Sequence, residues 1–228
     1  EEILDLVKKT ENEIILSDNV IIGDVYIGAG ETDGVRLLAR AAGKLKKLYP
    51  GIHYHISSGN AVFVREQLDK GLIDFGIIFG TPDLTKYEAL KLPAKDVWGV
   101  LMPKDSPLAE KEFISPEDLW GQPLLISQQE ADGGELVQWM KRSISELDIV
   151  MTYNLLFNAS LLVEEGLGYA ICFDRIINTS GDSRLCFRPL YPTIEIEMYM
   201  IWKKYQVFSK HAEKFLLMMQ ENINTVLT

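Results

Sequence analysis

Cysteine is scarce in this sequence: Cys172 and Cys186 are the only two among 228 residues. Two cysteines in a chain of this length do not form the disulfide framework of a small secreted domain. Both lie in apolar runs, YAICF and LCFRPL, which are typical of buried strands. The cysteines therefore indicate a reduced, cytoplasmic protein.

Long apolar runs and basic charge are missing as well. No segment approaches the roughly 20 apolar residues that cross a bilayer. The opening stretch, EEILDLVKKTENE, lacks the basic end and apolar centre of a secretory signal. The formal net charge is -10, whereas a nucleic-acid surface needs a basic footprint. We expect no membrane partner and no DNA binding by this chain alone.

Catalytic motifs are also absent from the sequence. There is no Gly-x-Ser-x-Gly elbow, no His-Glu-x-x-His and no phosphate loop. Gly28-x-Gly30 lacks the third glycine of a dinucleotide site and is interpreted as a tight turn. Spacing alone leaves a paired-carboxylate hydrolase open, and His53 and His55 share a strand face, where either a metal pair or a structural role fits. We expect no enzyme, no catalytic residue, no metal and no cofactor.

Strand and helix patterns alternate along the chain. Apolar strands are predicted at 25–30, 52–57, 72–79, 97–103, 123–127, 149–154, 168–173 and 194–202. Helices are predicted at 33–48, 60–71, 134–146 and 158–166, from Ser115, and from Ser209 to the end. Such alternation predicts an α/β protein with mixed, mostly parallel sheets flanked by helices.

Polar residues mark several predicted helix starts. Thr32 or Asp33 would cap the first helix, and Asn60 and Asn158 would cap two later ones. Ser115-Pro-Glu-Asp combines a capping serine, proline at the first helical position and an acid at the third. His211, at the start of the last helix, is expected to be exposed.

The alternation occurs in two blocks. We expect the end of a linker helix at 1–9, lobe one at 10–103 plus 195–228, and lobe two at 104–194. The last helix returns to lobe one because its apolar stripe needs a partner. Ligands of open α/β sheets collect beyond the carboxyl ends of strands, which favours a binding site in a cleft between the lobes.

The order of several short motifs resembles the effector-binding domain of LysR-type transcriptional regulators. These motifs are GDVYIGAG (23–30), LARAAGKLKKLYPGIHYHISSGN (38–60), REQLDKGLIDFGIIF (65–79), VLMPKDSPLAEKEFISPEDLWGQPLLIS (100–127) and LLVEEGLGYAICF (161–173). Phe173 replaces the family's usual proline, and Ser106 stands where many members carry histidine. The resemblance implies a two-lobed, type II periplasmic-binding-protein-like fold with a hinge and an inter-lobe cleft. The family's N-terminal winged helix-turn-helix, which reads DNA, has no counterpart in this sequence.

The resemblance also implies partners. We expect a small polar metabolite, carrying a carboxylate, and a homodimer that buries helices 35–49 and 135–145, with a tetramer left open for the full-length regulator. In the family, effectors contact residues at strand-to-helix junctions. The corresponding ligand-binding candidates are Thr32, Ser57, Ser58, Asn60, Phe79, Ser127, Gln128 and Asn158. A solute receptor of a transport system, or a deaminase or dehydratase on the same fold, is the alternative.

Overall fold

A computed structural model describes residues 21–131 and 134–227 of the chain, and its contacts divide the chain into two compact units. Of the described residues, unit 1 contains 21–30, Gly34–Lys95 and 197–227. Unit 2 contains Glu31–Asp33 and Asp96–Ile196. The linker helix predicted at 1–9 lies outside the described residues.

Two of the boundaries between the units lie inside continuous strands, β4 (Tyr87–Pro103) and β9 (Glu195–Lys203). The other two lie on either side of the segment Glu31–Asp33. The sequence had suggested boundaries at 103 and 194. An extended strand has no turn residues where it leaves one compact unit, so its sequence carries no boundary signal there.

The sheet of unit 1 is mostly parallel. It contains β1 (Gly23–Ala29), β2 (Ile52–Ser58) and β3 (Phe75–Phe79), and β9 adds an antiparallel strand beside β3. The strand order is β2-β1-β3-β9. The carboxyl ends of the three parallel strands therefore meet at one edge of the sheet.

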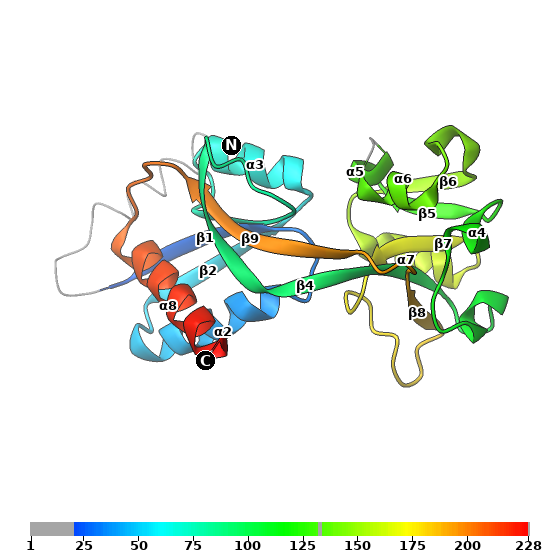
Figure 1. The fold of residues 1–228 in the computed structure, drawn as a ribbon. Helices are drawn as coiled ribbons and strands as arrows, with labels where there is room; N and C mark the ends of the chain where they lie inside the picture. Colours follow the sequence, from blue (N-terminus) through cyan, green and yellow to red (C-terminus); the bar gives the residue numbers. More distant parts are fainter. Residues whose placement is uncertain (1–20, 132–133, 228) are drawn as a thin grey trace. The chain divides into compact units, whose positions relative to one another are not determined.

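Helices cover both faces of this sheet (Figure 1). α2 (Val35–Leu48) and α8 (Lys210–Leu227) cover one face, and α3 (Ala61–Asp69) covers the other. Successive strand residues point to opposite faces, so Phe75 and Ile77 pack with α2 and α8 while Ile78 packs with α3. The apolar stripe of the last helix, including Phe215 and Met219, is buried in unit 1, where the sequence analysis had placed it.

Unit 2 repeats this design with a second mixed sheet. β5 (Leu124–Ser127) runs parallel to β6 (Ile149–Tyr153) and β7 (Tyr169–Phe173), and β4 runs antiparallel to β7 and β8 (Leu185–Pro189). The helices of this unit are short: η1 (Pro107–Glu110), α4 (Pro116–Leu119), α5 (Gln128–Ala131), α6 (Glu135–Met140), η2 (Ile144–Glu146) and α7 (Leu156–Glu164).

The core of unit 2 also has two layers. Leu119, Trp139 and Met140 from α4 and α6 pack on one face of the sheet, and Ala159 and Val163 from α7 pack on the other. The predicted α/β class, with mixed sheets flanked by helices, is thus confirmed in each unit.

Two predicted caps are confirmed by hydrogen bonds. The Asn60 Oδ1 atom accepts from the backbone N–H of Phe63 at 3.0 Å. Ser115 and Asp118 form a capping box, in which the Ser115 backbone N–H donates to the Asp118 carboxylate at 3.0 Å. Both local signals were sufficient to locate a helix start.

Other local predictions were wrong. α2 begins after Gly34 without a side-chain cap, so neither Thr32 nor Asp33 caps it. The helix predicted at 134–146 breaks after Met140, because Lys141 adopts a left-handed conformation with φ 55°. His211 is buried, with 4% exposure, since its ring lies where a Cβ on Gly23 would stand.

Candidate functional site

Two serines end the edge strand of unit 1. In the register of the parallel pair, Ser57 lies opposite Gly28 and Ser58 opposite Ala29. Both side chains are exposed, and the cap of α3, Asn60, follows two residues later. The structure therefore brings these three predicted residues together at the carboxyl edge of the sheet.

Phe79 stands at the same edge, at the end of β3. A Cβ built on Gly30 would lie 2.7 Å from the Phe79 ring, and the Gly59 N–H donates to the Ala29 carbonyl at 3.0 Å. Glycine at position 30 thus lets the backbone approach the ring closely. The ring is half-buried and stands at the same edge of the sheet as the serines, with β1 between their two strands.

The segment Glu31–Asp33 belongs to unit 2 by its contacts, and each of its three side chains has a partner there. The Glu31 carboxylate accepts from the backbone N–H of Leu156, at the start of α7. The Thr32 side chain hydrogen-bonds to Asp96. Asp33 pairs with Arg175 at 3.7 Å.

Asp96 is a buried acid in β4, with only 2% exposure. Burial raises the pKa of its carboxyl, and the hydrogen bond from Thr32 and the positive charge of Arg175 oppose that rise. Its Oδ2 atom is buried and has no hydrogen-bond partner among the described residues. A buried acceptor without a donor costs free energy and calls for an explanation.

A second buried polar atom of this kind belongs to Trp98, two residues further along β4. Its Nε1 atom is also buried without a hydrogen-bond partner in the described parts of the chain. The indole packs on Phe173, with ring centroids 4.3 Å apart. An unpaired donor thus follows an unpaired acceptor along one strand.

The remaining candidates in unit 2 are more scattered. Ser127 ends β5, and its Oγ accepts from the Glu130 N–H at 3.4 Å, while Gln128 is an exposed residue at the start of α5. Asn158 was wrongly predicted as a cap. It lies inside the first turn of α7, exposed, because the helix begins at Leu156.

Sequence reasoning missed Glu31, Asp96 and Arg175. Only Asp96 carried a usable signal, because it directly precedes the apolar run VWGVLM, in which residues 98–102 are all buried. The partners of Glu31 and Arg175 lie 125 and 142 positions away in the chain, at Leu156 and Asp33. No local pattern could have revealed such distant contacts.

The histidine pair sits on the exposed face of β2. His55 Nε2 lies 3.0 Å from Asp24 Oδ1, and His53 Nδ1 lies 3.9 Å from the same atom. The His55 ring stacks on Tyr26, with centroids 4.7 Å apart. Within the described ranges, no group of three or more histidine, cysteine or acidic side chains is arranged to hold a metal ion.

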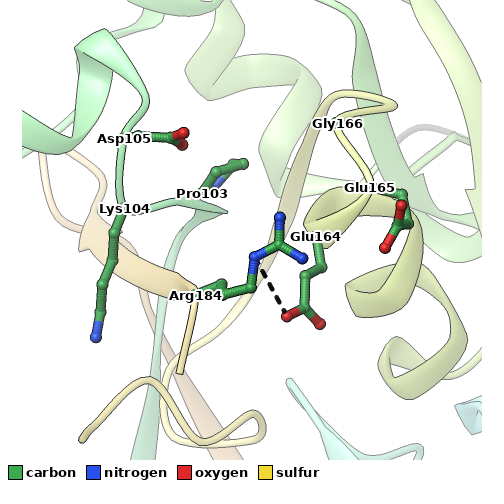
Figure 2. A pocket seen from close by; sticks show the side chains of 7 residues that line it. All are labelled: Pro103, Lys104, Asp105, Glu164, Glu165, Gly166 and Arg184. Atoms are coloured by element: carbon green, nitrogen blue, oxygen red, sulfur yellow. Dashed lines mark ion pairs between the residues drawn. The ribbon is translucent and has the colours of Figure 1, made fainter. Parts of the chain in front are cut away.

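A polar pocket of about 390 Å³ lies in unit 2, beside the amino end of β7 (Figure 2). Its lining residues are Pro103, Lys104, Asp105, Glu164, Glu165, Gly166 and Arg184. Arg184 points toward Glu164, with Nε 4.0 Å from Oε1, and Lys104 donates to the Gly181 carbonyl at 3.0 Å. The pocket contains none of the predicted site residues.

The arrangement of two α/β units, with polar residues after the carboxyl ends of parallel strands, is matched by a known family. The family model "LysR substrate binding domain" covers residues 20–224. The chain belongs to the LysR substrate-binding domain family.

Relatives of this LysR domain are transcriptional regulators. The uncharacterized HTH-type regulator YvbU of Bacillus subtilis is 25% identical over 96% of this chain, which spans 74% of that protein. The structure of HinK, a LysR-family regulator from Pseudomonas aeruginosa, matches with a TM-score of 0.72 at 18% identity, over 99% of this chain and 78% of HinK. The effector-binding domain of QuiR in complex with shikimate matches with a TM-score of 0.73 at 16% identity, over 90% of this chain and 99% of that one.

Family membership settles the broad class of activity. LysR substrate-binding domains are non-enzymatic parts of transcription regulators, so this domain is not an enzyme. Among the described residues, the length and apolarity that a membrane-crossing helix requires are not combined in any helix.

Proposed function

We propose that this LysR domain senses a small polar, carboxylate-bearing metabolite and, in the full-length regulator, controls DNA binding and transcription. The observation that carries the proposal is the group formed by Ser57, Ser58, Asn60 and Phe79 at one edge of a sheet. Ligands of open α/β sheets bind at such edges. Because the relatives are transcriptional regulators, we place the protein in the cytoplasm.

The carboxylate is assigned to the serine side of the site. Hydroxyl groups can donate to it, and the amino end of α3 carries partial positive charge from its backbone N–H groups. The apolar wall of Phe79 would face the carbon skeleton of the ligand. In this proposal the ligand occupies the cleft expected between the two units, with Thr32, Ser127, Gln128 and Asn158 as further contacts.

Signalling follows from a difference in affinity. A ligand shifts a conformational equilibrium only if it binds one state better than the other. We propose that the effector favours one relative orientation of the two units and thereby moves the DNA-reading domains of the full-length protein.

Calorimetry tests the binding site. A panel of small carboxylates that includes shikimate would be titrated into the wild type, Ser58→Ala and Asn60→Ala. Loss of one hydrogen bond to a charged group costs roughly 1.5 to 3 kcal/mol, about a ten- to hundred-fold drop in affinity. Ser180→Ala, an exposed serine outside the proposed site, is the control, and equal affinity in all four proteins would show that the ligand binds elsewhere.

We also propose a homodimer that buries α2 and the segment 135–145, since two-fold dimers are the commonest symmetric assembly. Leu48, at the end of α2, leaves 64% of its surface exposed and would contribute to that interface. Light scattering should give a dimer mass for the wild type and a lower mass for Leu48→Lys. Leu84→Lys, which changes another exposed leucine (59%) outside these helices, should remain dimeric.

A further inference from the structure

We propose that the polar pocket beside the amino end of β7 is a second ligand site, which binds a small zwitterion of the α-amino acid class (Figure 2). Its volume of about 390 Å³ lies within the range of roughly 300 to 1,000 Å³ that is usual for small-molecule sites. All of its lining residues belong to unit 2, so one unit forms the whole pocket.

The pocket is separate from the part of the proposed effector site that lies in this unit. β5 and β7 run parallel to one another. Ser127 is the last residue of β5, whereas Gly166 of the pocket lies three positions before Tyr169, the first residue of β7. The two places are therefore at opposite ends of neighbouring strands, and a ligand in the pocket would not occupy the position of the effector.

The guanidinium of Arg184 forms the cationic part of the pocket. Its ion pair with Glu164 is long, since Nε lies 4.0 Å from Oε1, beyond the distance of a hydrogen bond. The guanidinium has five N–H donors, and it forms no hydrogen bond with the described residues of the chain. Such a planar group binds a carboxylate through two parallel hydrogen bonds. We therefore assign Arg184 to the carboxylate of the ligand.

Two acids of the pocket have no partner of opposite charge. Across residues 21–131 and 134–227, the carboxylates of Asp105 and Glu165 form neither a hydrogen bond nor an ion pair. In the view of Figure 2 they lie on either side of the Arg184 guanidinium. An ionised carboxylate can only accept hydrogen bonds, and an ammonium group has three hydrogens to donate. We assign these two acids to the ammonium group of the ligand.

The carboxyl end of α7 adds negative charge beside Glu165. The backbone N–H of Gly166 donates to the Val163 carbonyl at 3.0 Å, and Gly166 has a φ of 82°. This is the glycine turn that ends many helices. A Cβ at position 166 would meet nothing within 4 Å, so the space beside the helix end is open. The partial negative charge of a helix carboxyl end stabilises a cation there.

The charges of the pocket favour a zwitterion over an ion of one sign. Lys104 is engaged within the chain, because its Nζ donates to the Gly181 carbonyl at 3.0 Å. An anion without an ammonium group would be repelled by Asp105 and Glu165, and a cation without a carboxylate would be repelled by Arg184. An α-amino acid has both charges within a few bonds of one another, so it can satisfy the acids and the guanidinium together.

Nuclear magnetic resonance of the ¹⁵N-labelled protein, titrated with alanine, propionate and ethylamine, tests the inference. Propionate is alanine without the ammonium group, and ethylamine is alanine without the carboxylate. The readout is the backbone amide signal of Gly166. We expect alanine to shift this signal with an affinity at least roughly tenfold above that of either single ion, the gain from a further hydrogen bond to a charged group.

Two results would overturn the inference. Propionate or ethylamine could shift the Gly166 signal as tightly as alanine does, or alanine could leave that signal unchanged. The amides of Ser58 and Asn60 report separately on the proposed effector site, and their response to alanine should be the same in the wild type and in Arg184→Gln. A response of Ser58 and Asn60 that disappears together with that of Gly166 in this variant would count against a second site.

Two pairs of variants separate the ends of the ligand. Arg184→Gln should remove the advantage of alanine over ethylamine, and Glu165→Gln should reduce the advantage of alanine over propionate. Arg40→Gln and Glu112→Gln make the same changes at exposed residues outside the pocket and should preserve both advantages. The Arg184 side chain is 70% exposed, so its replacement should leave the fold intact. Equal affinity for alanine in Arg184→Gln and the wild type would show that the inference is wrong.

Discussion

Replacing Asp96 by asparagine should stabilise the domain at neutral pH, although asparagine forms weaker polar interactions than aspartate. The wild-type carboxylate has 2% exposure and one oxygen without a hydrogen-bond partner among the described residues. Asparagine retains an acceptor for Thr32 and removes a charge on which the negative charges of Asp33 and Asp174 act unfavourably. Removing a buried and incompletely paired charge should raise the free energy of unfolding by about 1 kcal/mol. For a chain of this length, that corresponds to a rise in melting temperature of roughly 2 to 4 °C.

The stability that Asp96→Asn gains over the wild type should increase as the pH rises from acid to neutral. Burial raises the pKa of Asp96 in the folded protein above its ordinary value of 3.8. The wild type therefore has its full stability below the unfolded-state pKa and loses this contribution as the pH rises through the higher folded-state pKa. Asp96→Asn should match the wild type in acid and exceed it at neutral pH.

Thermal unfolding monitored by circular dichroism, over a series of pH values, measures this difference. Asp105→Asn removes one negative charge from an exposed position in unit 2 and controls for the change in net charge. If Asp96→Asn melts below both the wild type and Asp105→Asn at neutral pH, or if the difference does not vary with pH, the carboxylate stabilises the fold and the reasoning is wrong.

Four further outcomes follow from local geometry. Asn60→Ala removes the cap of α3 and should lower the free energy of unfolding by about 1 kcal/mol, measured by urea titration. Gly99→Ala should strongly destabilise or aggregate the protein, because a Cβ there would lie 2.4 Å from a carbonyl oxygen of β8. A Cβ at position 43 would meet nothing within 4 Å, so Gly43→Ala should stabilise α2 by up to about 1 kcal/mol. A melting temperature of Gly99→Ala as high as that of Gly43→Ala would contradict the packing argument. Cys172 and Cys186 are buried, and burial raises the pKa of both thiols, so iodoacetamide should label neither in the native protein at neutral pH but both in urea.

The sequence alone was sufficient where the signal is local. Hydrophobic periodicity located most strands of the two sheets to within a few residues. It gave no range for β8, where only the run LCFRPL around Cys186 was noted as strand-like, and it missed the first half of β4, where Lys91, Pro93 and Lys95 interrupt the apolar pattern. Asn60 and Ser115 marked helix starts because a capping side chain bonds to backbone only three residues away. The order of weak motifs was enough to identify the LysR family, because many short matches at the right spacing add information that none has alone.

One error reflects a local signal that was overlooked. Ser143 and Glu146 form a capping box, with the Ser143 N–H 2.9 Å from the Glu146 carboxylate. Such a box starts a new helical turn and competes with continuation of the helix from Met140. The pattern Ser-x-x-Glu is readable in the sequence, and it explains why the helix predicted at 134–146 is broken.

Only the tertiary structure decided the contacts of Glu31–Asp33. Thr32 and Asp33 are polar and follow a strand, so a helix cap was the natural local expectation for them. Instead, Glu31 caps α7, 125 positions away, and Thr32 bonds to the buried Asp96. The unpaired atoms of Asp96 and Trp98 depend in the same way on which distant residues surround β4. A helix cap or a periodic pattern of apolar residues depends on residues that are close in the sequence. The hydrogen bonds of a buried side chain depend on chain segments that only folding brings together.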